Sequence, residues 1–175
     1  MTKPAHGGPA RSEPAQGGPA QGEPIRRAGP QDADVVARLL RDFNIEYDDP
    51  APPQEQMAER IRALLAHGDT IILVAGDPPC ALSVTRFRQG LWSPKLESYL
   101  AELYVVPDRR GQGIGRALME ETMAVARAEG ADTMELGTGE ADVVARALYE
   151  SLGFTHTEHG PGGVETLSFF YEREL

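Results

Sequence analysis

Apolar residues recur along the chain at two different spacings, which predict an alternation of helices and strands. Val36, Leu39, Leu40 and Phe43 follow the repeat of an amphipathic helix. The run from Thr70 to Ala75 is instead continuously apolar, as buried strands are. Helices are therefore expected at residues 32–43, 54–67, 113–129 and 142–152, and strands at residues 25–28, 70–75, 80–87, 96–106, 133–136, 154–159 and 163–171.

The predicted order of elements is β-α-α-β-β-β-α-β-α-β-β, which indicates an α/β (α+β) domain. Helices that alternate with strands in this way cover both faces of one sheet. We therefore expect three layers, with a mixed central sheet of about six or seven strands flanked by about four helices. Asp32 or Asp34 is expected to cap the first helix through its side chain.

Residues 1–23 differ in composition from the rest of the chain. They are rich in Pro, Gly and Ala, and the tetrapeptide Gly-Gly-Pro-Ala begins at Gly7 and again at Gly17. Such a segment buries too little apolar surface to offset the entropy lost on ordering. We predict a disordered tail over residues 1–23 and one folded domain over residues 24–175.

The charge balance excludes some classes of partner. The formal net charge is −10, from 17 basic and 27 acidic residues. Nucleic-acid binding needs a basic face, so it is not expected. No apolar run reaches the about 18 residues of a membrane span, and no signal peptide is evident, so a cytoplasmic protein is expected. The single cysteine, Cys80, and four scattered histidines form no metal-ligand pattern, so we predict no metal.

Three glycines, Gly111, Gly113 and Gly115, lie between a predicted strand and a predicted helix. Glycine allows positive φ angles and lets a ligand approach the backbone closely. The first amides of a helix have no intrahelical acceptor and carry partial positive charge. With Arg110 and Arg116 nearby, the stretch predicts an anion-binding site.

Two well-known phosphate motifs do not fit this stretch. A P-loop needs a Lys after its last Gly, and neither Lys3 nor Lys95 is nearby. A dinucleotide fingerprint that starts at Gly111 fails because its third glycine position is Arg116. The pattern Arg/Gln-x-x-Gly-x-Gly/Ala fits from Arg110 to Gly115. Here the stretch resembles the pyrophosphate loop of the GCN5-related N-acetyltransferase (GNAT) superfamily.

A second motif supports the same resemblance. Residues 145–154 read Ala-Arg-Ala-Leu-Tyr-Glu-Ser-Leu-Gly-Phe. They are similar to the GNAT signature Ala-x-x-Leu-Tyr-x-x-x-Gly-Phe, and they follow the first motif by a helix and a strand. The resemblance extends over residues 25–175. It implies an N-acetyltransferase that moves the acetyl group of acetyl-CoA directly to an amine in a ternary complex. The alternative is a non-catalytic sensor on the same fold that only binds acyl-CoA.

The resemblance also implies roles for particular residues. Backbone groups of the strand Leu103-Tyr104-Val105 would pair with the pantetheine arm of CoA. The pyrophosphate would be held by Arg110, Gly111, Gln112, Gly113, Ile114, Gly115 and Arg116. Tyr149 would protonate the departing thiolate, or would only pack or donate a hydrogen bond to sulfur. Asp142 stands where relatives often have Asn beside the pantetheine, and it can cap the fourth helix.

The general base is less evident. A protonated amine is not a nucleophile, so a base is needed. Some relatives use a Glu at the position of Gly137, which cannot act here. Glu102 and Glu135 are the candidates, with Glu102 preferred because a desolvated carboxylate there could act through a water.

The acceptor is predicted only as an amine, on a small molecule or a peptide. It should be bounded by the first two helices, the loop at residues 88–96 with Trp92, and the turn at Gly160. Acidic residues suggest a cationic acceptor, namely Glu46, Asp48, Asp49 and Glu97. Relatives are often dimers, so a homodimer is possible by resemblance.

Overall fold

The computed structural model describes residues 22–91, 94–157 and 168–175. Four α-helices are described within these ranges: α1 (Ala33–Glu46), α2 (Gln54–His67), α3 (Ile114–Ala128) and α4 (Val143–Ser151). The strands are β1 (Ile25–Arg27), β2 (Thr70–Ala75), β3 (Ala81–Gln89), β4 (Leu96–Val105), β5 (Ala131–Gly139), β6 (Thr155–Thr157) and β7 (Ser168–Glu174). Two short 3₁₀ turns are η1 (Pro30–Asp32) and η2 (Pro107–Arg109). The predicted order of elements is confirmed.

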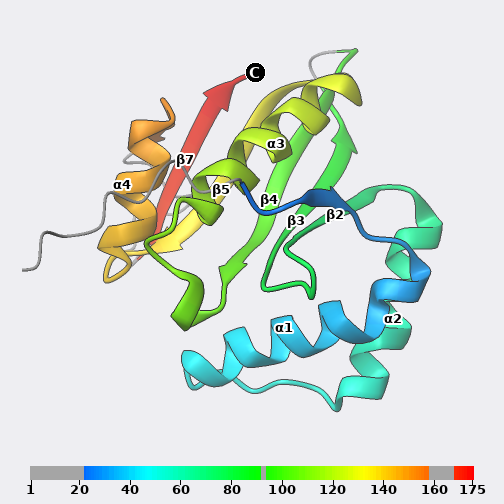
Figure 1. Cartoon of the computed structure of the whole chain (residues 1–175). Helices are drawn as coiled ribbons and strands as arrows, with labels where there is room; N and C mark the ends of the chain where they lie inside the picture. The colour runs from blue at the N-terminus through cyan, green and yellow to red at the C-terminus, as the bar shows by residue number, and fades with distance from the viewer. Residues whose placement is uncertain (1–21, 92–93, 158–167) are drawn as a thin grey trace, which may run out of the picture.

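All seven described strands belong to one sheet, in the order β1-β2-β3-β4-β5-β7-β6. Every neighbouring pair is antiparallel except β4 and β5, which run parallel and are connected through α3. A parallel pair needs a crossover connection, and the apolar stripe of α3 packs that crossover onto the sheet. The predicted mixed sheet with four helices is confirmed (Figure 1).

The helices cover opposite faces of the sheet. Buried residues of α1 and α2 pack on Ile72, Val74 and Leu82, whereas α3 packs on Leu73 and Ala81. This alternation along β2 and β3 is the period of two expected of strands buried on both faces. The fourth helix shares a core with α3, β5 and β7. Figure 1 shows α1 and α2 together on one side and α3 and α4 on the other.

The two central strands separate halfway along their length. β4 and β5 are paired from Leu96 to Leu100 on β4, and the last pair joins Leu100 to Leu136. Beyond this point β4 stays paired with β3, and β5 stays paired with β7. The register between β3 and β4 shifts at this point, so Ala101 is an extra residue in β4, a β-bulge that bends the strand. The bend opens a gap in the middle of the sheet.

Four predicted elements ended too early: β3 continues to Gln89 and β7 to Glu174, and β5 and α1 are also longer than predicted. β5 was expected to end at Leu136 because Gly137-Thr138-Gly139 reads as a turn, but these residues pair with β7 and belong to the strand. α1 continues three residues beyond Phe43, to Glu46. The last turn of α1 is held by tertiary contacts, since Phe43 packs against Tyr104 with ring centroids 5.5 Å apart.

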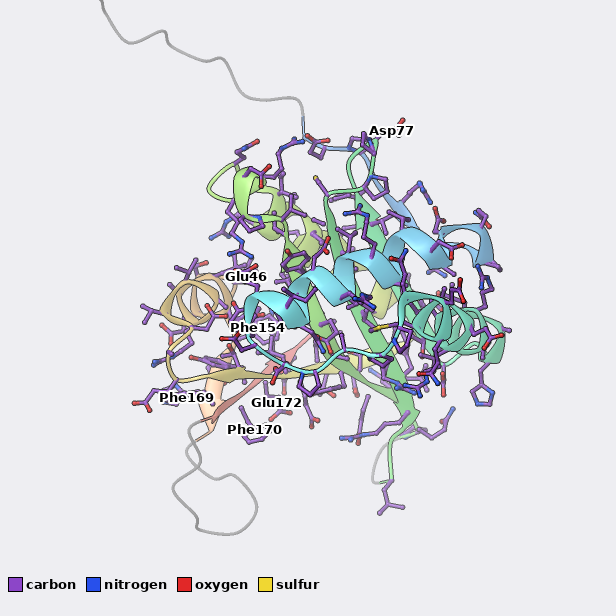
Figure 2. The ribbon with its side chains drawn as sticks, turned by 90° about the horizontal axis from the view of Figure 1, so that it is seen from below. Glu46, Asp77, Phe154, Phe169, Phe170 and Glu172 are labelled. Carbon is purple, nitrogen blue, oxygen red and sulfur yellow. The ribbon has the colours of Figure 1, made fainter. Side chains whose placement is uncertain are left out.

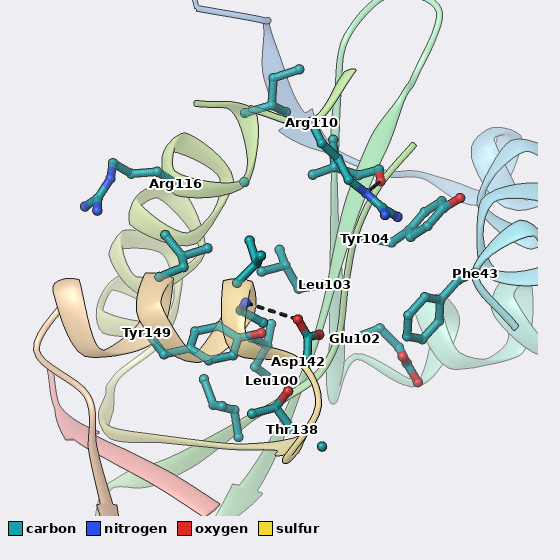
Figure 3. A pocket seen from close by; sticks show the side chains of 18 of the residues that line it. Phe43, Leu100, Glu102, Leu103, Tyr104, Arg110, Arg116, Thr138, Asp142 and Tyr149 are labelled. Atoms are coloured by element: carbon teal, nitrogen blue, oxygen red, sulfur yellow. Dashed lines mark hydrogen bonds between the residues drawn. The ribbon is translucent and has the colours of Figure 1, made fainter. Parts of the chain in front are cut away.

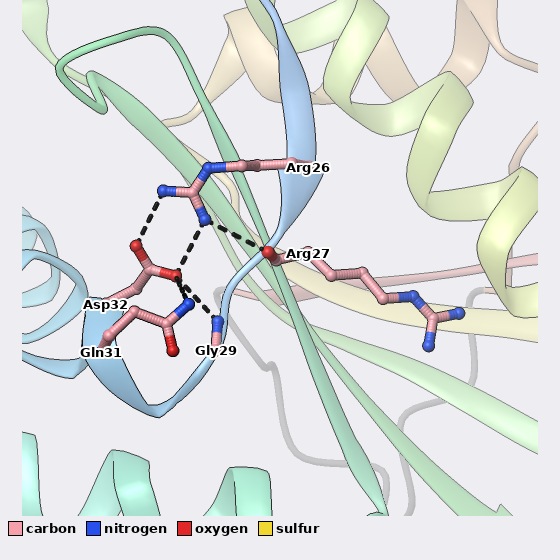
Figure 4. Close-up of polar contacts among 5 residues, drawn as sticks. All are labelled: Arg26, Arg27, Gly29, Gln31 and Asp32. Atoms are coloured by element: carbon pink, nitrogen blue, oxygen red, sulfur yellow. Dashed lines mark hydrogen bonds and ion pairs between the residues drawn. The ribbon is translucent and has the colours of Figure 1, made fainter.

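The predicted side-chain cap of α1 was wrong. Asp32 makes no side-chain hydrogen bond to the amides of α1. Its carboxylate points back instead, and accepts the amide of Gly29 at 2.8 Å and both terminal nitrogens of Arg26 at 2.7 and 2.8 Å (Figure 4). Asp34 is also no cap, because it forms an exposed ion pair with Arg62. The buried Asp32 carboxylate therefore ties β1 to the turn before α1.

Replacing Asp32 by Asn should lower the free energy of unfolding by about 1–2 kcal/mol, because a buried, charge-assisted hydrogen-bonded contact is lost. The hydrogen bonds and charge of Arg26 lower the pKa of Asp32 below its ordinary value. The unfolded chain therefore takes up this proton more readily than the folded protein. The stabilisation should be complete above pH about 4 and disappear as pH falls through the lowered folded pKa.

Urea denaturation of the wild type and Asp32→Asn at pH 7 and at pH 3 measures this difference. Asp34→Asn is the matched control, since its exposed ion pair should contribute at most about 0.5 kcal/mol. A loss at pH 7 that is equal for the two variants would contradict the role given to Asp32.

Candidate functional site

A cavity of about 730 Å³ lies where β4 and β5 separate. This size is ordinary for a small-molecule site. Figure 3 shows side chains from the start of α3, from α4 and from α1 converging on it. The predicted site residues that line this cavity are Glu102, Leu103, Tyr104, Val105, Arg110, Gly111, Gly113, Ile114, Gly115, Arg116, Asp142 and Tyr149. Of the residues predicted to bind the cofactor, Gln112 alone does not line this cavity; it lines a smaller cavity beside residues 22–25.

The glycine stretch forms a tight loop at one end of the cavity. Gly111 and Gly113 have φ angles of 72° and 82°, a conformation that favours glycine. Gly113 is the N-cap of α3, and the first helical hydrogen bond runs from the Ala117 amide to the Gly113 carbonyl at 3.0 Å. The amides of residues 114–116 therefore precede the helical bonding pattern and are available to an anion.

Each arginine of this loop already has a carboxylate partner. Arg109 is paired with Glu23, just before β1, and Arg116 lies 3.8 Å from Glu120 on α3. Arg110 is paired with Glu46. Figure 2 shows Glu46 at the end of α1 that is nearest α4. The positive charge predicted for this loop is present, but it is balanced by carboxylates from three different parts of the chain.

The Arg110 guanidinium forms the most extensive of these contacts. Nη1 and Nη2 donate to the two carboxylate oxygens of Glu46 at 2.6 and 2.7 Å. Nε donates to the Val105 carbonyl at 2.8 Å, and the guanidinium carbon lies 5.7 Å from the centre of the Tyr104 ring. The Glu46 contact raises the pKa of Arg110 and lowers the pKa of Glu46. Arg110 therefore links the loop, β4 and α1.

The β4 segment beside the loop has its two faces in different surroundings. Leu103 and Val105 pack on the side of α3, and Tyr104 packs on the side of α1. Tyr104 is only 4% exposed. On the side of the gap this segment has no strand partner, so its edge can pair with an extended ligand, as β-strand addition requires.

Tyr149 lies deep in the cavity and is 6% exposed. Its ring packs against Phe154 and Tyr171, each with centroids 6.0 Å away. Figure 3 shows its hydroxyl directed toward Asp142 and Glu102. Burial raises the pKa of Tyr149 well above its ordinary value, and the nearby negative charge of Asp142 and Glu102 adds to this effect. The phenol is therefore held in its neutral, hydrogen-bond-donating form.

The two candidate bases occupy very different places. Glu102 lines the cavity, and among the described residues no hydrogen bond or ion pair reaches its carboxylate. Burial raises its pKa. Glu135 does not line the cavity, is paired with Arg88 at 3.1 Å, and is partly exposed to solvent. Gly137 lines the cavity but has no side chain. Of these positions, the geometry favours Glu102 as a base.

Asp142 caps α4, because its Oδ1 accepts the amide of Ala145 at 3.1 Å. The capping expected from the sequence is thus confirmed. Among the cavity side chains that the sequence reasoning missed are Phe43, Tyr47 and Thr138. Phe43 and Tyr47 were predicted only as part of a general boundary by the first helix. Thr138 was read as part of a turn, so no signal pointed to it.

The described residues cover only some of the remaining predictions. Trp92 and the turn at Gly160 lie outside the described residues, as do residues 1–21 of the predicted tail. Asp49 lines the cavity, whereas Glu97 is paired with Arg88 at 2.5 Å. Within the described ranges, no three or more His, Cys, Asp or Glu side chains gather as metal ligands. None of the described helices is long and apolar enough to cross a membrane.

Comparison with known proteins is consistent with this geometry. A sequence model of the acetyltransferase (GNAT) family matches residues 35–154. The crystal structure of a protein from Arthrobacter sp. FB24, assigned as an acetyltransferase, has a TM-score of 0.73 and 42% identity, and the match covers 83% of this chain and 92% of that chain. Thialysine N-epsilon-acetyltransferase of Bos taurus is 29% identical over 142 residues, which are 74% of this chain and 82% of the relative.

Another match covers much less of the relative. Mycothiol acetyltransferase of Beutenbergia cavernae is 38% identical over 78 residues, which are 41% of this chain. The match covers 26% of that protein, so this chain spans about a quarter of its length.

Replacing Glu46 by Gln should strengthen the binding of CoA, because a phosphate then no longer competes with an internal carboxylate for Arg110. We expect up to about a fivefold lower dissociation constant, since a partly exposed ion pair contributes up to about 1 kcal/mol. Calorimetric titration with CoA measures this constant. Arg110→Gln should weaken binding, and adding Glu46→Gln to that variant should then change nothing. Weaker binding by Glu46→Gln alone would show that Glu46 orients Arg110 for the phosphate.

Proposed function

Because the chain belongs to the acetyltransferase (GNAT) family, we propose that it transfers the acetyl group of acetyl-CoA to an amine. The observation that carries this proposal is the cavity between β4 and β5, which joins an open strand edge to the free amides at the start of α3. The pyrophosphate would bind these amides and the loop arginines. The pantetheine arm would extend along Leu103 and Val105, which leads the thioester toward Tyr149 and Glu102.

Acetyl-CoA, when bound, supplies a thioester whose C–S bond breaks as a C–N bond to the amine forms. For the amine to attack, the protein must first remove a proton from the incoming ammonium, and it must support the negative charge that develops on sulfur as the C–S bond breaks. Glu102 is proposed as the base, directly or through one water. Burial raises the pKa of Glu102, which brings the basicity of its carboxylate closer to that of the amine it would deprotonate.

Tyr149 is proposed to act on the leaving sulfur. A thiol has an ordinary pKa of about 8.5 and a phenol of about 10. Since burial raises the pKa of Tyr149 further, complete proton transfer from Tyr149 to the thiolate is uphill. Donation of a hydrogen bond is therefore the favoured role, and the proton that finally binds sulfur comes from the amine nitrogen.

A direct transfer with both substrates bound fits the described cavity. A covalent acetyl-enzyme would need a nucleophile beside the thioester. Cys80, the only cysteine, is instead buried between β2 and β3, and its thiol donates a hydrogen bond to the Ala75 carbonyl. The alternative is a sensor that binds acyl-CoA without turnover. The glycine at position 137 favours that alternative, because it removes the base used by some relatives.

Gly113→Ala should weaken the binding of acetyl-CoA, because a methyl group and a strained φ angle would disturb the amides that face the phosphate. Gly130→Ala is a matched control. Both glycines have positive φ, 82° and 95°, and in both cases an added Cβ meets no atom within 4 Å. Only Gly113 lines the cavity.

A thermal shift with acetyl-CoA measures this effect. At a ligand concentration of about 100 times the dissociation constant, the wild type and Gly130→Ala should gain about 2.7 kcal/mol of stability. Gly113→Ala should lose most of that gain. Equal gains in both variants would show that the phosphate does not bind at this loop. No gain in the wild type would contradict the proposed function.

Glu102→Gln should lower kcat/KM by about a hundredfold near neutral pH, since a positioned base commonly contributes that much. In the wild type the rate should rise with pH through the raised pKa of Glu102. In the variant this rise should be replaced by one at the pKa of the free amine, so that the difference shrinks at high pH. Release of free CoA thiol over a range of pH measures both profiles.

Glu135→Gln serves as the control for this experiment. Its carboxylate is paired with Arg88 outside the cavity, so activity should change little. Turnover that is equally impaired in both variants at all pH values would argue against Glu102 as the base. Binding of acetyl-CoA with no thiol release for any amine would favour the sensor.

A further inference from the structure

Three aromatic side chains form a wall of the cavity beside the proposed base. Phe43 and Tyr47 lie one turn apart on α1 with ring centroids 5.0 Å apart, and Tyr104 on β4 lies 5.5 Å from Phe43. All three line the cavity. Figure 3 shows Phe43 next to Glu102, on the side away from Tyr149. A molecule that presents its nitrogen to Glu102 would therefore lay its carbon skeleton against these rings.

One edge of this aromatic wall is buried and the other is exposed to solvent. Tyr104 is buried, whereas Tyr47 is 50% exposed at the end of α1 and so leaves the wall open to solvent at one edge. Aromatic faces bind apolar groups and also attract a cation that lies over them. An ammonium group held by Glu102 could thus also be attracted by the faces of these rings.

The charges around the cavity select against acidic acceptors. Its described lining contains three carboxylates, on Asp49, Glu102 and Asp142. Its only described cations are the arginines at 109, 110 and 116, and each of them is already paired with a glutamate. An amine that also carried a carboxylate would bring a further negative charge into this region.

Arg110 is the cation nearest the aromatic wall, since its guanidinium lies over Tyr104. Its Nη1 and Nη2 are held by Glu46 and its Nε by the Val105 carbonyl. An acceptor carboxylate would have to displace Glu46 or remain unpaired. A desolvated group left without a partner is costly, which makes the Glu46–Arg110 pair a filter against such acceptors.

We propose that the acceptor is an alkyl or aralkyl amine whose apolar skeleton packs on Phe43 and Tyr47, and which has no carboxylate next to its amino carbon. Free α-amino acids are excluded from this class. The inference rests on the proposed acetyl transfer, and it makes Phe43, Tyr47 and Asp49 specificity-determining residues.

Four amines test the proposal at saturating acetyl-CoA: 2-phenylethylamine, hexylamine, ethanolamine and phenylalanine. The first two should be acetylated with a kcat/KM at least about tenfold above the last two, since ethanolamine lacks an apolar skeleton and phenylalanine adds an unpaired carboxylate. The comparison of 2-phenylethylamine with phenylalanine isolates the carboxylate.

Two variants test which residues cause this selectivity among amines. Tyr47→Ala removes a half-exposed ring, so it should raise the KM for 2-phenylethylamine about threefold to tenfold while leaving ethanolamine nearly unchanged. Asp49→Asn removes one of the three carboxylates that line the cavity, so it should narrow the difference in kcat/KM between 2-phenylethylamine and phenylalanine by up to about fivefold. A merely structural defect would instead slow all four amines alike.

The outcomes separate this inference from the proposed function. Turnover in which phenylalanine or ethanolamine equals 2-phenylethylamine would overturn the inference while acetyl transfer stands. Absence of turnover with every amine, beside normal binding of acetyl-CoA, would overturn both. A selectivity that is present in the wild type but unchanged in Asp49→Asn and Tyr47→Ala would show that these residues do not cause it.

Discussion

The separation of β4 from β5 beyond Leu100 is the constraint on which the site depends. Two parallel strands normally satisfy each other's backbone groups, and here they stop doing so in the middle of the sheet. The bulge at Ala101 bends β4 away, while β7 keeps the glycine-rich end of β5 in the sheet. An unpaired strand edge in the interior is costly unless something covers it. In this protein that edge forms one wall of the cavity, so the feature that weakens the sheet is also the one that can recognise an extended ligand.

Carboxylates control the charge at the other end of the cavity. Three arginines gather at the start of α3, where the helix itself already favours an anion. Left alone, they would repel one another and the amides around them. Glu23, Glu46 and Glu120 balance them, and the carboxylate of Glu46 also connects the loop to α1. The bond between Arg110 and Glu46 therefore lies between the proposed cofactor end and the proposed acceptor wall, and it can influence both.

The reacting centre combines two groups whose pKa values are both raised by burial. For a carboxylate this shift makes a better base, and for a phenol it makes a worse acid. In the proposed mechanism the same surroundings would therefore give the two residues different tasks, with Glu102 accepting a proton and Tyr149 remaining a donor of hydrogen bonds. Asp142 contributes to this field from the N-terminus of α4, where the cap holds its carboxylate in place.

The sequence by itself determined the order of elements, the glycine loop and the family, because these depend on local patterns: apolar periodicity, positive-φ glycines and the spacing of two motifs. It also placed Tyr149 and Glu102 correctly as cavity residues. It could not show that β5 runs through two glycines or that Phe43 packs against Tyr104. These facts depend on contacts between residues far apart in the chain. Only the folded chain shows that Arg88 pairs with Glu135, whereas Glu102 lies in the cavity, because both placements depend on how distant segments pack.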